Sequence, residues 1–190
     1  MTRKPIYLNN NFALGVLIVC ALLSIVFGGA RSLNAVRHKA VAVFEHGVDG
    51  DGVSVKNDMQ KRADKAWTII AIAEKYPELA ASTEALRNAA NNSSAEDIDS
   101  LYVSDDLITK YGEILYTNLQ NVNLSEKDTT NLKNAYNELR SRGNTIAHDG
   151  YNELAQKYNQ LLSKGHAAVL RAVGLVKPLS YYGIYFGGVE

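Results

Sequence analysis

An uninterrupted apolar segment near the start of the chain constrains the fold more than any other feature. Residues 12–30 have the sequence FALGVLIVCALLSIVFGGA and contain no charged side chain. A helix rises about 1.5 Å per residue, so about 20 apolar residues cross a hydrocarbon core of about 30 Å. Inside that core a helix satisfies its backbone hydrogen bonds from within the segment itself. We therefore predict a transmembrane helix over residues 12–30, with the lipid bilayer as a partner.

A cleaved secretory signal is the alternative interpretation of this segment. Arg3 and Lys4 supply the basic start of such a signal, and the small residues 28–30 resemble a cleavage site. The apolar run is longer than the roughly 7–15 residues of a usual signal core, which favours a retained anchor. The alternative is a secreted or periplasmic helical protein. Cys20 is the only cysteine, so no internal disulfide is expected.

Composition narrows the class of the remaining chain. The 190 residues leave room for one ordinary domain after the anchor. Basic and acidic residues are equal in number, 20 of each, whereas proteins that bind nucleic acid usually carry a basic excess. Helix-forming residues dominate the segments after the apolar run, and alternating β-branched patterns are scarce. We predict an all-α fold and no nucleic-acid partner.

Helical spacing of apolar residues continues directly beyond the apolar run. We expect the first helix to extend over Ser32 to His46 and to end at Gly47. The stretch 47–52 is rich in glycine and aspartate and predicts a connector. Asp49 and Asp51 resemble the opening of a calcium loop, but the following positions lack the remaining oxygen ligands. No metal is expected there.

Apolar stripes predict three further helical segments. The first starts at Ser54, carries the stripe Met59, Ala63, Ala66, Ile70 and Ala73, and is interrupted at Pro77. The second covers residues 95–119, is capped by Ser93 or Ser94, and has Asp105, Asp106 and Glu113 on its polar face.

The third segment is expected to be one long helix that begins after Ser125. Ser125 and Asp128 have the spacing of a capping box. The helix is predicted to continue through Gly143 and Gly150, with a stripe that includes Tyr151, Leu154, Tyr158 and Leu161.

Three short motifs resemble a known family. The motifs are QKRAD at 60–64, NTIA at 144–147, and the pairs Tyr151 with Asn152 and Tyr158 with Asn159. They resemble, over most of the chain, the LemA family of bacterial single-span membrane proteins. The resemblance implies an N-terminal transmembrane helix followed by an antiparallel bundle of about four long helices. It implies no particular reaction, because the molecular function of the family is not established.

The resemblance also implies a location. It suggests a single-pass protein of the bacterial plasma (inner) membrane with the bundle in the cytoplasm. Charge does not decide this orientation, because Arg3 and Lys4 precede the apolar run, and Arg31, Arg37 and Lys39 follow it.

These expectations divide the chain into five segments. They are a leader at 1–11, the transmembrane helix at 12–30, a membrane-proximal helix and Gly/Asp turn at 31–52, the helical-bundle domain at 53–176, and an aromatic, glycine-rich tail at 177–190. The aromatic cluster Tyr181 to Phe186 in the tail has three interpretations: sealing of the bundle core, contact with the membrane interface, or a binding edge. We adopt core sealing as the prediction.

The candidate site residues are Tyr151, Asn152, Tyr158 and Asn159. With a spacing of seven residues, the two tyrosines share one helix face, and the two asparagines form a neighbouring row. In one interpretation these residues are structural, because buried polar groups need hydrogen-bond partners. In the other, the row is a docking surface for a protein partner. Both interpretations are open at this point.

No pattern in the sequence points to catalysis. The histidines His38, His46, His148 and His166 are scattered, and no two lie at the i, i+4 spacing of a helical metal site. Nucleophile-elbow, phosphate-loop and dinucleotide motifs are missing. We predict a non-enzymatic scaffold or protein-interaction module with no catalytic residue, cofactor or metal. The alternative is an enzyme or metal protein whose site has no recognisable motif.

Overall fold

The computed structural model describes residues 10–48 and 53–182, and this part of the chain is almost entirely helical. Its α-helices are α1 (Asn10–His46), α2 (Val55–Ala73), α3 (Ala80–Asn91), α4 (Ile98–Leu119), α5 (Glu126–Ala147), α6 (Gly150–Leu161) and α7 (Gly165–Ala172). Single-turn 3-10 helices, Pro77–Leu79 and Asn92–Ser94, flank α3. The all-α prediction is confirmed for these residues. Most of the leader, the connector residues Asp49 to Gly52, and the tail from residue 183 onward lie outside the described residues.

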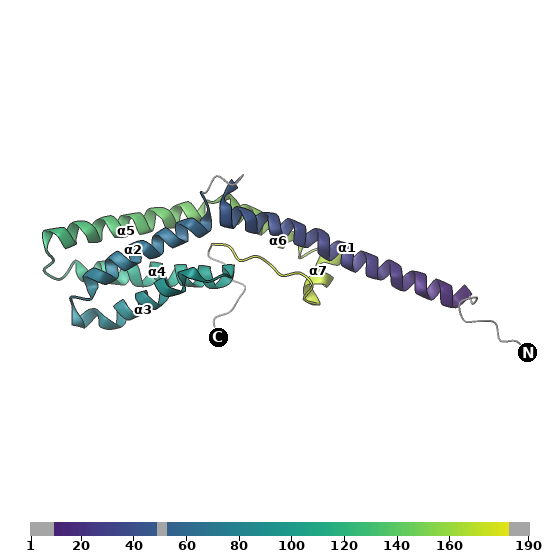
Figure 1. The fold of residues 1–190 in the computed structure, drawn as a ribbon, viewed down its shortest axis with the longest axis horizontal. Coiled ribbons are helices and arrows are strands. Elements are labelled where there is room, and N and C mark those ends of the chain that lie inside the picture. Colours follow the sequence, from purple (N-terminus) through teal and green to yellow (C-terminus); the bar gives the residue numbers. More distant parts are fainter. Residues whose placement is uncertain (1–9, 49–52, 183–190) are drawn as a thin grey trace, which may run out of the picture.

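The first helix, α1, contains both the predicted span and its predicted extension. It is a single helix of 37 residues. It ends at His46 because Gly47 follows with a φ of 82°, a conformation that glycine adopts without steric cost. α1 is long and apolar enough to cross a membrane, and its most apolar stretch has no buried residue. The N-terminal part of α1 projects beyond the other helices (Figure 1).

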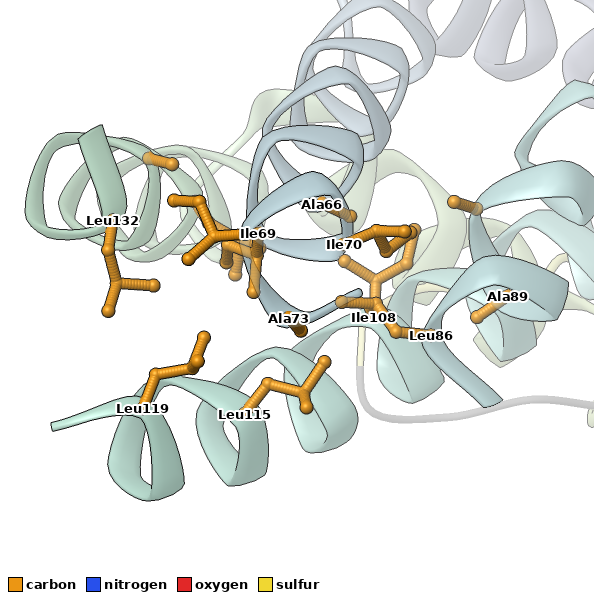
Figure 2. Packing of buried hydrophobic residues seen from close by; sticks show 14 of the residues in the cluster. Ala66, Ile69, Ile70, Ala73, Leu86, Ala89, Ile108, Leu115, Leu119 and Leu132 are labelled. Atoms are coloured by element: carbon orange, nitrogen blue, oxygen red, sulfur yellow. The ribbon is translucent and has the colours of Figure 1, made fainter. Parts of the chain in front are cut away.

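The apolar core of α2 to α5, which we call the distal cluster, is aliphatic. Its buried residues are Ala63, Ala66, Ile69, Ile70, Ile72, Ala73, Leu79, Leu86, Ala89, Ala90, Ile108, Leu115, Leu119, Leu132, Ala135 and Leu139. Figure 2 shows Leu115 and Leu119 rising from α4 toward α2. The predicted stripe of α2 is buried throughout, as expected. Its alanines allow the neighbouring helices to approach closely.

A second core, which we call the proximal cluster, joins α1, α6 and α7 to the first turns of α2 and α4. It contains the rings of Phe44, Tyr102, Tyr151 and Tyr158. The Phe44 ring meets the Tyr151 ring edge-on, with centroids 5.1 Å apart. α6 packs along α1, and α5 packs along α2 (Figure 1). The helices packed around these two cores form one elongated unit, which we call the body. The buried residues of one core are aliphatic, and the other core contains aromatic rings.

The long helix predicted after Ser125 is in fact two helices. α5 ends at Ala147, and α6 begins at Gly150. Between them Asp149 has an extended backbone, and its carboxylate accepts a hydrogen bond from the Tyr151 amide at 2.7 Å. An aspartate in this position is a helix N-cap, so the prediction of one continuous helix was wrong.

The new start of the helix also changes which side chains of α6 face the core. Ala155 and Leu162 are buried in the proximal cluster. Leu154 and Leu161, which the continuous pattern placed in the stripe, are exposed. Tyr151 and Tyr158 of the predicted stripe are buried as expected, so the prediction was wrong only for the two leucines. A helix that restarts begins a new phase, which shifts the buried face toward Ala155.

Helix α5 is capped as the sequence predicts, because Ser125 accepts a hydrogen bond from the Asp128 amide at 3.1 Å. Ser54, where a helix was predicted to start, is also an N-cap and accepts a hydrogen bond from the Asn57 amide at 3.2 Å. The cap of α4 is Asp97 rather than Ser93 or Ser94, both of which lie in the preceding 3-10 turn. The two serine caps belong to α2 and α5, the pair that packs closely in the distal cluster.

Candidate functional site

All four predicted site residues lie on α6, and they face inward. Tyr151, Asn152 and Tyr158 are buried, and Asn159 is half-buried. The segment they face is the chain's own C-terminal stretch, residues 179–182, which runs back along α6 toward the start of α4. The tyrosine–asparagine row is thus covered by a part of the same chain.

Asn159 binds the backbone of the C-terminal stretch through both ends of its amide. Its side-chain carbonyl accepts a hydrogen bond from the Leu179 amide at 2.9 Å. Its side-chain NH₂ donates to the Leu179 carbonyl at 2.7 Å. The Asn159 side chain thus pairs with the backbone NH and the carbonyl of Leu179, which lie outside any helix or sheet.

Asn152 joins three parts of the fold. Its NH₂ donates to the carbonyls of Ile146 at 2.6 Å and Ala147 at 3.2 Å, which are among the last carbonyls of α5. Its side-chain carbonyl accepts from the Tyr182 amide at 3.0 Å and from the Tyr102 hydroxyl of α4 at 3.4 Å. One buried amide therefore caps the end of α5 and holds the C-terminal stretch.

The two tyrosines differ in their hydrogen bonding. The Tyr151 hydroxyl donates to the Ser180 carbonyl at 2.5 Å, so it also contacts the C-terminal stretch. Burial raises the pKa of Tyr151, against an opposing effect of Arg37, and keeps its hydroxyl protonated as a donor. The Tyr158 hydroxyl is buried without a hydrogen-bond partner among the described residues. Its ring packs in the proximal cluster.

The structure also contains a buried ion pair that the sequence did not indicate. Arg62 of α2 and Asp105 of α4 are both almost fully buried, and the guanidinium donates to the Asp105 carboxylate. The same guanidinium donates to the Thr109 hydroxyl at 2.6 Å. The expectation that Asp105 belongs to a polar, solvent-facing side of its helix was therefore wrong, because Arg62 allows the carboxylate to be buried.

The pair occupies a layer between the two cores. Along α2, Met59 lies in the proximal cluster and Ala63 in the distal cluster, with Arg62 between them. On α5, Gly143 faces the same layer, and a Cβ atom at that position would lie 3.3 Å from the guanidinium. Because Gly143 has no side chain, the Arg62 guanidinium can pack directly against the backbone of α5 at this position.

Burial changes the acidity of this carboxylate. Loss of solvent raises the pKa of Asp105 to about 6, although Arg62 opposes the change. The Asp105 Oδ1 and the Arg62 Nε are buried without a hydrogen-bond partner among the described residues. The pair is therefore a costly polar layer that specifies how α2, α4 and α5 align.

Carboxylates near the surface clefts at the start of α4 have structural roles. Two clefts there, of about 640 and 620 Å³, share Asp97 and Asp99 in their walls. Asp97 caps α4, and Asp99 accepts a hydrogen bond from the Ser180 hydroxyl. Among the described residues, no group of three histidine, cysteine or carboxylate side chains is arranged to hold a metal ion.

No family model, curated protein or solved structure matches the chain. The likeness to the LemA family thus rests on the three short motifs alone. The function has to be argued from the geometry of α1, the two cores and the C-terminal stretch.

Proposed function

We propose that this protein is a single-pass, non-enzymatic scaffold of the bacterial cell membrane, built on the plan of the LemA family. The observation that carries the proposal is the division of α1. Its apolar segment touches little of the fold, while Ala40 and Phe44 farther along the same helix are buried in the proximal cluster. A helix with a bare apolar part and a packed part joins a bilayer to a folded body.

This division of α1 supports a rigid connection between the bilayer and the body rather than a flexible linker. At about 1.5 Å per residue, residues 12–30 have a length of about 28 Å along the helix axis, and residues 31–46 add about 24 Å. No loop separates the two parts of α1. The body therefore stands at a set distance and angle from the bilayer, which suits a protein that presents a surface to partners near the membrane.

We propose that α2 to α5 form the antiparallel four-helix bundle that the resemblance implies. Support comes from the packing of α2 against α3, α4 and α5, and of α3 against α4, around the distal cluster. Short connections between consecutive helices favour antiparallel neighbours. The exposed faces of this bundle are the proposed docking surface for a protein partner.

We propose a structural role for Tyr151, Asn152, Tyr158 and Asn159. The hydrogen bonds of Tyr151, Asn152 and Asn159 to residues 179–182 support it, as does the burial of the Tyr158 ring in the proximal cluster. A docking role for the same residues would require the C-terminal stretch to dissociate from α6 and expose them.

The cytoplasmic orientation gains support from the way the chain folds back. Helix α7 lies beside α1 at Gly29, next to the end of the apolar segment. Folding thus brings Lys164 and Arg171, which flank these contacts in sequence, to the same end of the span as Arg31, and these charges add to those that follow the span in sequence. Positive residues are favoured on the cytoplasmic side, where the leaflet is anionic.

Membrane fractionation of the full chain tests the anchor. We expect the protein to stay in carbonate-washed bacterial membranes with its residues before Arg31 intact by mass spectrometry. A control variant, Ile18→Lys with Leu22→Lys, should leave the membrane and remain helical, because both side chains are exposed in the fold. A soluble parent chain that begins at Arg31 would instead establish a cleaved signal.

Protease protection then tests the orientation. Protease added to spheroplasts should leave the body intact and should digest it only after the membrane is opened. Digestion in intact spheroplasts would place the body outside the cytoplasm and would overturn this part of the proposal.

A further inference from the structure

Helix α7 is the part of the folded body that lies nearest the apolar segment of α1. A Cβ atom at Gly29 would lie 3.3 Å from Leu170 Cδ1 and 3.4 Å from His166 Cδ2. Ala167 and Leu170 are buried against α1 in the proximal cluster. The glycine permits this close approach. α7 therefore sits where the predicted span ends, and Figure 1 shows it beside the middle of α1.

A neighbouring side of α7 is apolar and bare. Val169 is 62% exposed, Val173 63% and Leu175 42%. Val169 and Val173 are four residues apart, so they lie on the same face of the helical turn. Gly174, with a φ of 75°, turns the chain back just after α7. These three side chains therefore lie where the chain reverses direction after α7, beside the end of the predicted span. We call this turn the tip.

The surroundings of this tip are basic. Between Glu153 and Glu190 the sequence contains no aspartate or glutamate. Lys164 and Arg171 are exposed along this segment. A short amphipathic helix with bare apolar side chains and a basic border is typical of a helix that lies in the headgroup region of an anionic bilayer.

We propose that α7 and the turn through Leu175 are a second membrane contact, immersed at the boundary between headgroups and acyl chains of an anionic leaflet. The proposal rests on the membrane anchor proposed above. Continuity with the span identifies the occupant as lipid. Ile25 of α1 lies four residues before Gly29, on the same side of the helix, and is 59% exposed, so the bare faces of α1 and α7 meet one common surface. Lys164 and Arg171 bind the lipid phosphates, and the contact fixes the rotation of the body about α1.

Site-directed spin labelling of the full chain in vesicles tests this contact. In a Cys20→Ala background, single cysteines replace Val169 or Val173 and carry a nitroxide. Ile18→Cys provides the lipid reference, and Leu154→Cys provides the reference for an exposed apolar residue of the body, far along α6 from α7. Collision rates with oxygen and with a water-soluble nickel chelate report the depth of each label.

At positions 169 and 173 we expect a ratio of oxygen to nickel accessibility several-fold above that at 154 and below that at 18. A ratio equal to that at 154 overturns the proposal while the reference at 18 remains in lipid. Labels shielded from both reagents also overturn it, because a second copy or another protein then covers α7. An aqueous signal at 18 instead contradicts the anchor itself.

Lipid composition tests the basic border. The labels at 169 and 173 should lie deeper in vesicles that contain phosphatidylglycerol than in pure phosphatidylcholine. The double variant Lys164→Gln with Arg171→Gln should lose most of that difference, whereas Lys157→Gln, on the exposed surface of α6, should keep it. Equal depths in both lipids overturn the assignment of anionic headgroups.

Discussion

The distal and proximal clusters both bury helix faces, but they are held together in different ways. The distal cluster comes from consecutive helices, α2 to α5, and is filled by alanine, leucine and isoleucine. The proximal cluster joins Ala40 to Leu179 and combines edge-on and tilted ring contacts with hydrogen bonds from Asn152 and Asn159 to distant backbone groups. The end of the body nearest the proposed membrane therefore depends on directional contacts, whereas the far end depends on the apolar packing of helix faces.

This contrast has a consequence for stability. The proximal cluster is held partly by single hydrogen bonds to the extended stretch 179–182, whereas the distal cluster buries whole helix faces. Regions that differ in this way commonly open as separate units. We expect the proximal cluster to open more easily than the distal cluster, and the layer of Arg62 and Asp105 to mark the boundary between them.

The largest expected effect comes from breaking that layer. Asp105→Ala leaves the Arg62 guanidinium buried without its counter-ion, which should lower the free energy of unfolding by about 3–5 kcal/mol. Urea denaturation of the full chain in detergent, followed by circular dichroism, measures the loss. Asp106→Ala is the matched control, because Asp106 is adjacent and exposed, and it should change stability by less than about 0.5 kcal/mol. Equal effects of the two variants would mean that the layer does not hold the clusters in register.

A smaller effect is expected from the asparagines. Asn152→Ala leaves the Ile146 carbonyl and the Tyr182 amide without the partners they now have, so it should cost about 1–3 kcal/mol. Asn159→Ala should fall in the same range, because Leu179 loses two hydrogen bonds. Asn137→Ala, at an exposed position of α5, is the control. Costs as small as that of the control would return the asparagines to the docking interpretation.

A third expected effect is a pH dependence that belongs to Asp105. Its pKa rises to about 6 on folding, so the folded state holds an additional proton between about pH 4 and 6. Stability relative to an Asp105→Asn variant should therefore increase as the pH falls from 7 to 4. Asp97, Asp128 and Glu138 have lowered pKa values and act in the opposite direction, but the difference between the two chains cancels their contribution. A difference that stays constant with pH would contradict the raised pKa.

Features set by local sequence were predicted well. The apolar run, the stop at Gly47, the stripe of α2 and the cap at Ser125 each depend on residues within a few positions of one another. The break at Asp149 also had a local signal, since aspartate followed by glycine favours a cap over a helix interior. The phase error at Leu154 and Leu161 followed from missing that signal.

Features set by distant partners were not predicted. Arg62 and Asp105 are 43 residues apart, and each has the appearance of a surface charge when its own helix is considered alone. The interpretation of Asn159 depended on Leu179, 20 residues away in a segment without helical pattern. A charged or amide side chain is equally compatible with solvent and with a buried partner, so the pattern along one helix does not distinguish the two.

Hydrogen exchange of the full chain and its Phe44→Ala variant, measured by mass spectrometry in the same nanodiscs, tests the central claim most directly. Phe44 is the α1 side chain that packs against Tyr102 and Tyr151, so its removal opens a cavity in the proximal cluster. We predict faster exchange in α6 and in the last turns of α1, with unchanged exchange in α3 and in the distal halves of α2 and α5. Equal acceleration in every helix, or no change in α6, would contradict the claim that α1 is both the membrane anchor and a part of the proximal cluster.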